Sequence, residues 1–146
     1  MASDRNAGFT ILSATGATLI ISALFLFSGF PKLQEYFVVR SAASSLVEEL
    51  KKAQRLATGE DLDRRIRLTS ERGYVREKRA GAGWLFEQAY VLGDGLEVSG
   101  PSDIEFQSHS ALSPVALYRI RGPKAVRFEI VTAKDGRISL KWAGIV

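Results

Sequence analysis

The chain has 146 residues, of which 46% are hydrophobic and 25% are charged, and its formal net charge is +4. This composition excludes a disordered protein and gives enough chain for one modest domain with an extension. There is no cysteine, which excludes a disulfide framework, a cysteine-ligated zinc site and a thiol nucleophile.

The first predicted element is an uncharged helix near the N-terminal end. Residues 7–31 carry no charged side chain, and residues 8–30 are enough to cross the hydrocarbon core of a bilayer, which takes about 20 helical residues. A secretory signal peptide would have a more basic start, a shorter apolar stretch and a small-residue cleavage site. A helix buried in a protein core would need a partner segment. We therefore predict a membrane-spanning helix over residues 9–30, whose orientation the flanking charges do not decide.

The helix is expected to continue over residues 31–58, where apolar and small residues form one stripe. Their spacing alternates between three and four, which is the repeat of one helix face: Tyr36, Val39, Ala43, Leu46, Leu50, Ala53 and Ala57. Gly59 is the predicted stop, and Pro31 is expected to bend or interrupt the helix. A dimeric coiled coil would use the same stripe. The alanines in the stripe and the strand-rich sequence that follows favour packing on a sheet.

Residues 59–146 change to a period of two, which is typical of strands with one buried face. The alternation involves Ile66, Leu68, Ile104, Phe106, Val126, Phe128, Ile130, Ile138, Leu140 and Trp142. Asp135 and Gly136 predict a hairpin turn, and Gly81 and Gly83 separate two further strands at 74–79 and 84–92. We expect an α+β fold in which the helix stripe packs on one face of a mainly antiparallel sheet.

The junction between Gly8 and Phe9 is the most specific signal in the chain. The sequence GFTIL, followed by an uncharged helix and a strand-rich domain, resembles the type IV prepilins and pseudopilins. The resemblance implies that a prepilin peptidase cleaves after Gly8 and methylates Phe9 as the new N-terminal residue. It implies four parts: a leader at 1–8, a transmembrane and filament-core helix at 9–30, its amphipathic continuation at 31–58 and a β-rich globular domain at 59–146.

The C-terminal sequence narrows the resemblance. The helix at 41–57, the segment DIEFQSHSALSPVALYRI and the segment VRFEIVTAKDGRISL are similar to H-type minor pseudopilins of type II secretion and to related minor pilins. This resemblance implies a structural subunit without enzymatic activity, cofactor or metal. The implied partners are other pseudopilins or pilins in a filament, prepilin peptidase, the inner-membrane assembly platform and the lipid bilayer. The implied location is the bacterial inner membrane, crossed once, with the C-terminal domain in the periplasm or outside, and the filament after assembly.

Ser13 departs from the family pattern. The family usually carries a glutamate at this position, where the carboxylate pairs with the N-terminal amine of a neighbouring subunit. An unpaired charge inside a bilayer costs about 2.5–3.5 kcal/mol or more. Serine removes both that cost and the pairing group, and it can bond to its own helix backbone. Two interpretations stay open: a tip or initiating subunit, and a divergent subunit with relaxed assembly. Pro31 lies close to the family's usual membrane-exit proline.

Other side-chain groups have simpler interpretations. His109 is the single histidine and lies in a serine-rich segment, where solvation is expected. The acids Glu60, Asp61 and Asp63 are interpreted as a solvated helix end, although such a cluster also suits calcium. Residues 93–95 read GDG and are interpreted as a turn, because no helix signal follows.

A basic region supplies the alternative function. Its positive charges are interrupted by Glu71 and Glu77 and consist of Arg64, Arg65, Arg67, Arg72, Arg76, Lys78 and Arg79. Such a region can contact DNA phosphates, as in a competence pseudopilin or a DNA-binding minor pilin. The alternation of charge favours a solvated sheet face instead, and no aromatic run interleaves with it as single-strand binding requires. DNA is therefore the weaker of the two partner hypotheses.

Overall fold

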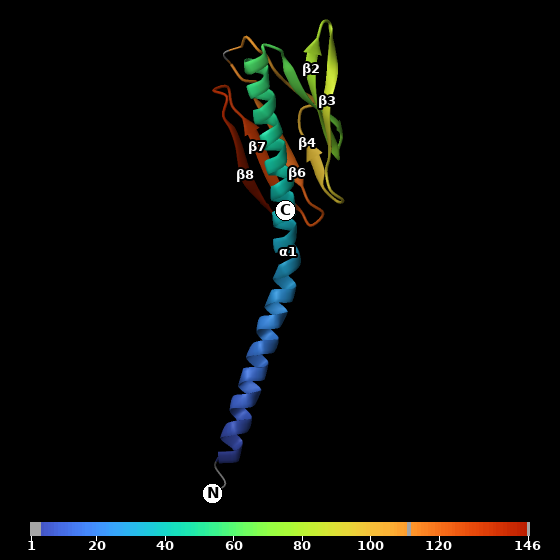
Figure 1. Ribbon diagram of the computed structural model, residues 1–146. Coiled ribbons are helices and arrows are strands. Elements are labelled where there is room, and N and C mark those ends of the chain that lie inside the picture. The colour runs from blue at the N-terminus through green and yellow to red at the C-terminus, as the bar shows by residue number, and fades with distance from the viewer. Residues whose placement is uncertain (1–3, 111, 146) are drawn as a thin grey trace. The chain divides into compact units, whose positions relative to one another are not determined.

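The computed structural model describes the backbone of residues 4–110 and 112–145 and the side chains of residues 23, 32–110 and 112–144. The chain forms two compact units, Met1–Gln34 and Glu35–Val146. The helix α1 (Asp4–Glu60) contributes to both. The second unit also contains the strands β1 (Arg64–Ser70), β2 (Gly73–Ala80), β3 (Gly83–Val91), β4 (Glu97–Ser99), β5 (Asp103–Phe106), β6 (Ala116–Arg121), β7 (Val126–Thr132) and β8 (Ile138–Ile145) (Figure 1).

The ends of α1 differ from the prediction. The helix begins at Asp4 instead of Phe9. The prediction that Gly59 stops the helix is wrong, because α1 continues to Glu60. Asp61 follows in the left-handed conformation, with φ 56°, and this conformation ends the helix. Pro31 lies within α1 and does not end it, although a proline inside a helix removes one backbone hydrogen bond.

The predicted apolar stripe of α1 is confirmed as the centre of the core. Tyr36 is half-buried, and the other six stripe residues have at most 1% exposure: Val39, Ala43, Leu46, Leu50, Ala53 and Ala57. The alanines allow the strands to approach the helix closely. From Glu35 onward, α1 lies against both sheets of the domain (Figure 1), and apolar residues of both sheets belong to the same buried cluster as the stripe.

The strands form two antiparallel sheets, so the expectation of a single sheet is wrong. The first has the order β3-β2-β1-β5 and the second the order β4-β6-β7-β8. The alternation of residues located β1, β5, β7 and β8, and the glycine break located β2 and β3, but neither signal located β4 and β6. Strand β4 has only three residues, and in β6 the exposed Leu117 breaks the apolar alternation. These two strands pair with each other and extend the β7–β8 hairpin into a separate sheet.

The predicted turn at Asp135 and Gly136 is confirmed between β7 and β8. Gly136 has φ 83°, a conformation that glycine adopts without strain, and Ala133 and Arg137 bond across the turn. The predicted separation of β2 and β3 at Gly81 and Gly83 is also confirmed, since Ala80 pairs with Gly83 across that turn.

Candidate assembly interface

The residues predicted for processing and assembly lie in α1. Gly8, Phe9, Ser13 and Pro31 have helical backbone, but their side chains lie outside the described residues. Among the residues that the structure describes, no helix is long and apolar enough to span a bilayer. Cleavage after Gly8, methylation of Phe9 and the roles of Ser13 and Pro31 therefore stay predictions.

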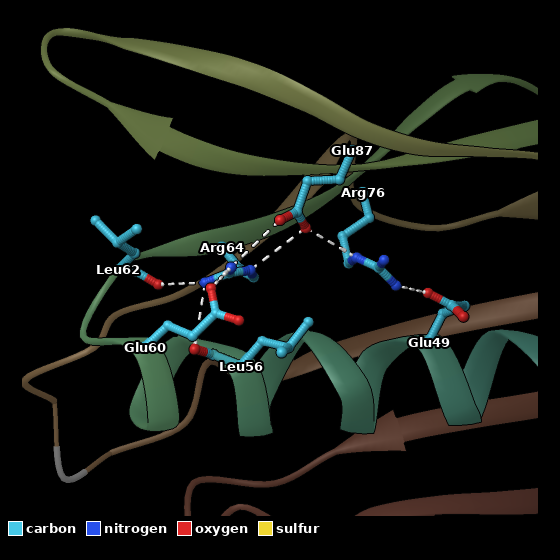
Figure 2. Close-up of polar contacts among 7 residues, drawn as sticks. All are labelled: Glu49, Leu56, Glu60, Leu62, Arg64, Arg76 and Glu87. Atoms are coloured by element: carbon cyan, nitrogen blue, oxygen red, sulfur yellow. Dashed lines mark hydrogen bonds and ion pairs between the residues drawn. The ribbon is translucent and has the colours of Figure 1, made fainter.

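A buried arginine joins the C-terminal end of α1 to the first sheet. Arg64 on β1 has a side chain with only 1% exposure, and its guanidinium forms an ion pair with Glu60 of α1. It also donates to the backbone carbonyls of Leu56, at 3.2 Å, and Leu62, at 3.1 Å. Its Nε and Nη2 atoms donate to both carboxylate oxygens of Glu87 on β3, at 3.3 and 3.2 Å (Figure 2). These contacts hold the helix end, the connecting segment and the sheet in one arrangement.

Glu87 also accepts a hydrogen bond from an arginine of the neighbouring strand. The Nε atom of Arg76 on β2 donates to Glu87 at 3.0 Å, and Arg76 also pairs with Glu49 of α1 (Figure 2). Burial alone would raise the pKa of Glu87, but the hydrogen bonds from Arg76 and Arg64 outweigh it and lower the pKa below its ordinary value. Glu87 is therefore held as a carboxylate between two arginines.

A β-bulge turns Glu87 toward the helix. Arg76 pairs with Gln88 and Glu77 pairs with Phe86, which leaves Glu87 as the extra residue of β3. Arg76 faces the helix and pairs with Gln88, so strict alternation would place Glu87 on the face away from the helix. The sequence pattern therefore did not predict this network. The useful signal would have been Glu87 itself, because it is an acidic residue in a sheet that also carries Arg64 and Arg76.

The basic region considered for DNA is largely neutralised by internal ion pairs. Besides Arg64 and Arg76, Arg65 and Arg67 both donate to Glu77, at 2.5 and 2.8 Å. The hydrogen bond from Arg67, reinforced by that from Arg65, lowers the pKa of Glu77 against the opposing effect of burial. Arg72 pairs with Asp94 at 2.7 Å. Five of the seven cations of this region thus have a carboxylate partner on their own domain, which leaves few charges for phosphate contacts.

The acidic cluster at the helix end also has structural partners. Glu60 pairs with Arg64, and Asp63 accepts hydrogen bonds from the backbone N–H and the hydroxyl of Ser108, at 2.8 and 3.1 Å. His109 is 82% exposed, with its Nδ1 atom 3.4 Å from Asp61. Glu60 and Asp61 remain 52% and 70% exposed, which fits the interpretation of a solvated helix end.

An apolar groove beside α1 is the clearest surface for protein contact. It has a volume of about 510 Å³, and Phe37 and Val38 of α1 line one side while Tyr90 and Val91 of β3 line the other. Strand β3 is an edge strand, and its exposed apolar residues include Val91, which is 83% exposed. Exposed apolar residues next to an unpaired strand edge are typical of association surfaces. We therefore regard this groove as the candidate assembly interface.

Sequence comparisons identify no relative: no family model matches the chain, and no curated protein matches it. Solved structures do match. The minor pseudopilin EpsH of the type 2 secretion system of Vibrio cholerae gives a TM-score of 0.63 at 17% identity, covering 73% of this chain and 98% of that one. The type IV minor pilin FimU of Pseudomonas aeruginosa gives a TM-score of 0.60 at 14% identity, covering 70% of this chain and 87% of that one. The predicted resemblance is thus confirmed at the level of the fold, and this chain has the pilin-like fold of these minor subunits.

Proposed function

We propose that this chain is a minor pseudopilin, a structural subunit of a type II secretion pseudopilus. The observation that carries the proposal is the fold similarity to EpsH over nearly the whole of that chain, in a sequence with a Gly8-Phe9 junction before an uncharged helix. The buried ion-pair network links Arg64, Arg76 and Glu87 of the sheet to Glu49 and Glu60 of α1. Its contacts join the helix to the sheet, and this supports a subunit that works by association.

The proposed sequence of events starts in the bacterial inner membrane. Residues 9–30 hold the subunit there as a single span, with the C-terminal domain in the periplasm. Prepilin peptidase hydrolyses the peptide bond after Gly8 and methylates the amine of Phe9. The inner-membrane assembly platform then extracts the subunit into the filament. In the filament, residues 9–30 pack among other helices, and the groove lined by Phe37 and Val91 contacts a neighbouring subunit.

Mass spectrometry of the N-terminal peptide tests the class of protein. The full chain is co-expressed with a prepilin peptidase that processes a control prepilin in the same cells. We expect a mature chain that begins at N-methylated Phe9. A Gly8→Val variant keeps the apolar character of the junction but should remain uncleaved. An intact Met1 or Ala2 terminus in the wild-type chain, with the control prepilin processed, would overturn the proposal.

The position in the filament is a second part of the proposal. Because Ser13 offers no carboxylate to the N-terminal amine of a neighbour, we propose a position at or near the tip. Quantitative immunolabelling should then find a few copies at filament ends, and a Ser13→Glu variant should leave assembly intact or change its order. A high copy number along the filament shaft would contradict the tip position while leaving the pseudopilin assignment in place.

A further inference from the structure

Aromatic side chains gather at the end of the domain from which α1 leads back to residues 9–30. Phe37 is 56% exposed and Trp142, on β8, is 58% exposed. Tyr36 lies between them, with ring centroids 5.6 Å from Phe37 and 6.0 Å from Trp142. We call Tyr36, Phe37 and Trp142 the aromatic collar. Its members come from opposite ends of the sequence, so the tertiary fold brings them together.

Glu35 fixes the turn between β6 and β7 beside the aromatic collar. Its Oε1 atom accepts a hydrogen bond of 2.7 Å from the backbone N–H of Lys124. Gly122 allows the close approach, since a Cβ atom there would contact the Glu35 carboxylate and lie 2.7 Å from Val39 Cγ2. The side chain of Lys124 is exposed at the same end of the domain.

Positive charge without a carboxylate partner flanks the aromatic collar. Within the described part of the chain, the exposed cations Arg40 and Lys124 form no ion pair. The acid at this end of α1, Glu35, is buried. Asp94 is exposed in the neighbouring turn, but Arg72 pairs with it at 2.7 Å. The aromatic collar is thus a basic surface as well as an aromatic one.

The sequence places this surface next to the apolar run. Tyr36 follows Phe30 by only six residues in the sequence. Six residues span at most about 20 Å even when fully extended. If residues 9–30 span the membrane, the chain therefore keeps the aromatic collar within reach of the lipid headgroups.

We propose that the aromatic collar, with Arg40 and Lys124, docks on the anionic headgroup layer of the membrane in which the subunit is stored. This inference rests on the membrane stage of the proposed function. Tryptophan and tyrosine favour the membrane–water interface, and basic side chains near an anionic leaflet are attracted to it. Docking fixes the height of the domain above the bilayer before assembly, and extraction into the filament releases it.

The two tryptophans of the chain provide a matched pair of probes. Trp142 belongs to the aromatic collar, while Trp84 lies near the other end of α1, where the guanidinium carbons of Arg65 and Arg79 are 4.4 and 5.1 Å from its ring centroid. The full chain is reconstituted in phosphatidylcholine vesicles with brominated acyl chains, with and without phosphatidylglycerol. A Trp84→Phe variant reports on Trp142 alone, and a Trp142→Phe variant reports on Trp84 alone. Thermal unfolding of both variants shows that the domain is intact.

The outcomes separate this inference from the proposed function. Docking predicts that bromine quenches Trp142 more than Trp84, and that the difference grows when phosphatidylglycerol is included. Equal quenching of both tryptophans, in a chain that remains with the vesicles after an alkaline wash, would overturn docking and leave the membrane span standing. Quenching of Trp142 that is the same without phosphatidylglycerol would overturn the role of Arg40 and Lys124. Loss of the chain in the alkaline wash would overturn both the membrane stage and docking.

Discussion

Glu87 joins the two buried arginines that connect the first sheet to α1. It accepts hydrogen bonds from Arg64 and Arg76, whose side chains are only 1% and 8% exposed. Buried guanidinium groups cannot lose their proton, so they need a carboxylate nearby. The extra residue in β3 supplies this carboxylate where regular alternation would direct it to the opposite face.

A Glu87→Gln substitution should therefore destabilise the domain. The amide keeps one acceptor but leaves the two arginines without a shared negative charge, and we expect a loss of about 2–3 kcal/mol in the free energy of unfolding. Chemical denaturation of the full chain in detergent, followed by near-ultraviolet circular dichroism, measures it. Glu48→Gln is the matched control, because Glu48 is 64% exposed on α1 and should change the stability by less than about 0.5 kcal/mol. Equal effects of the two substitutions would contradict the assigned role.

The acid dependence of stability follows from the same carboxylate. The pKa of Glu87 is lowered in the folded domain, so its contribution is complete above the unfolded-state pKa and is lost as the pH falls through the lower folded-state pKa. The difference in unfolding free energy between the wild-type chain and Glu87→Gln should shrink as the pH falls below the ordinary glutamate value of 4.5. A difference that stays constant over this range would show that the effect of the substitution is steric.

At the scale of elements, the stripe of α1 organises the core. Leu46 has no exposed surface and packs in the cluster that includes both sheets. Leu46→Ala should lower the unfolding free energy by about 2–5 kcal/mol, because it removes buried methyl groups and leaves a cavity. Val38→Ala on the same helix should cost little stability, since Val38 is 48% exposed. Because Val38 lines the groove that is proposed to contact another subunit, its substitution should reduce filament assembly without lowering the unfolding temperature.

The elements also show which features of the fold can be predicted from sequence. The stripe that includes Leu46 was predictable because burial follows the helical period directly. The end of α1 was not, because Asp61 adopts a left-handed conformation that glycine usually takes. The division into two sheets depends on long-range pairing of β1 with β5 and of β4 with β6, which alternation along one strand does not reveal. The aromatic collar was not predictable either, because Tyr36 of α1 meets Trp142 of β8 only through tertiary packing.

At the scale of the whole molecule, positive charge is distributed between two different uses. Most arginines of the basic region stabilise the domain through internal ion pairs, whereas Arg40 and Lys124 remain exposed beside the aromatic collar. The formal net charge of +4 therefore does not predict how strongly the chain binds nucleic acid. The binding strength depends on how many cations can contact phosphates without breaking an ion pair within their own domain.

This distribution predicts weak DNA binding by the basic region. Only Lys78 and Arg79 lack a carboxylate partner among the seven cations in the described structure. Each phosphate contact adds about −0.9 to the slope of log K against log salt, so two contacts give a slope of about −2. Fluorescence anisotropy of the full chain in detergent with a labelled duplex, at several salt concentrations, measures this slope. Glu77→Gln serves as the comparison, because it frees Arg67, whereas Arg65 keeps Asp103 at 3.6 Å, and it should steepen the slope toward about −3. A wild-type slope already as steep as that of the variant would mean that the paired arginines contact DNA, and the competence alternative would then displace the secretion subunit.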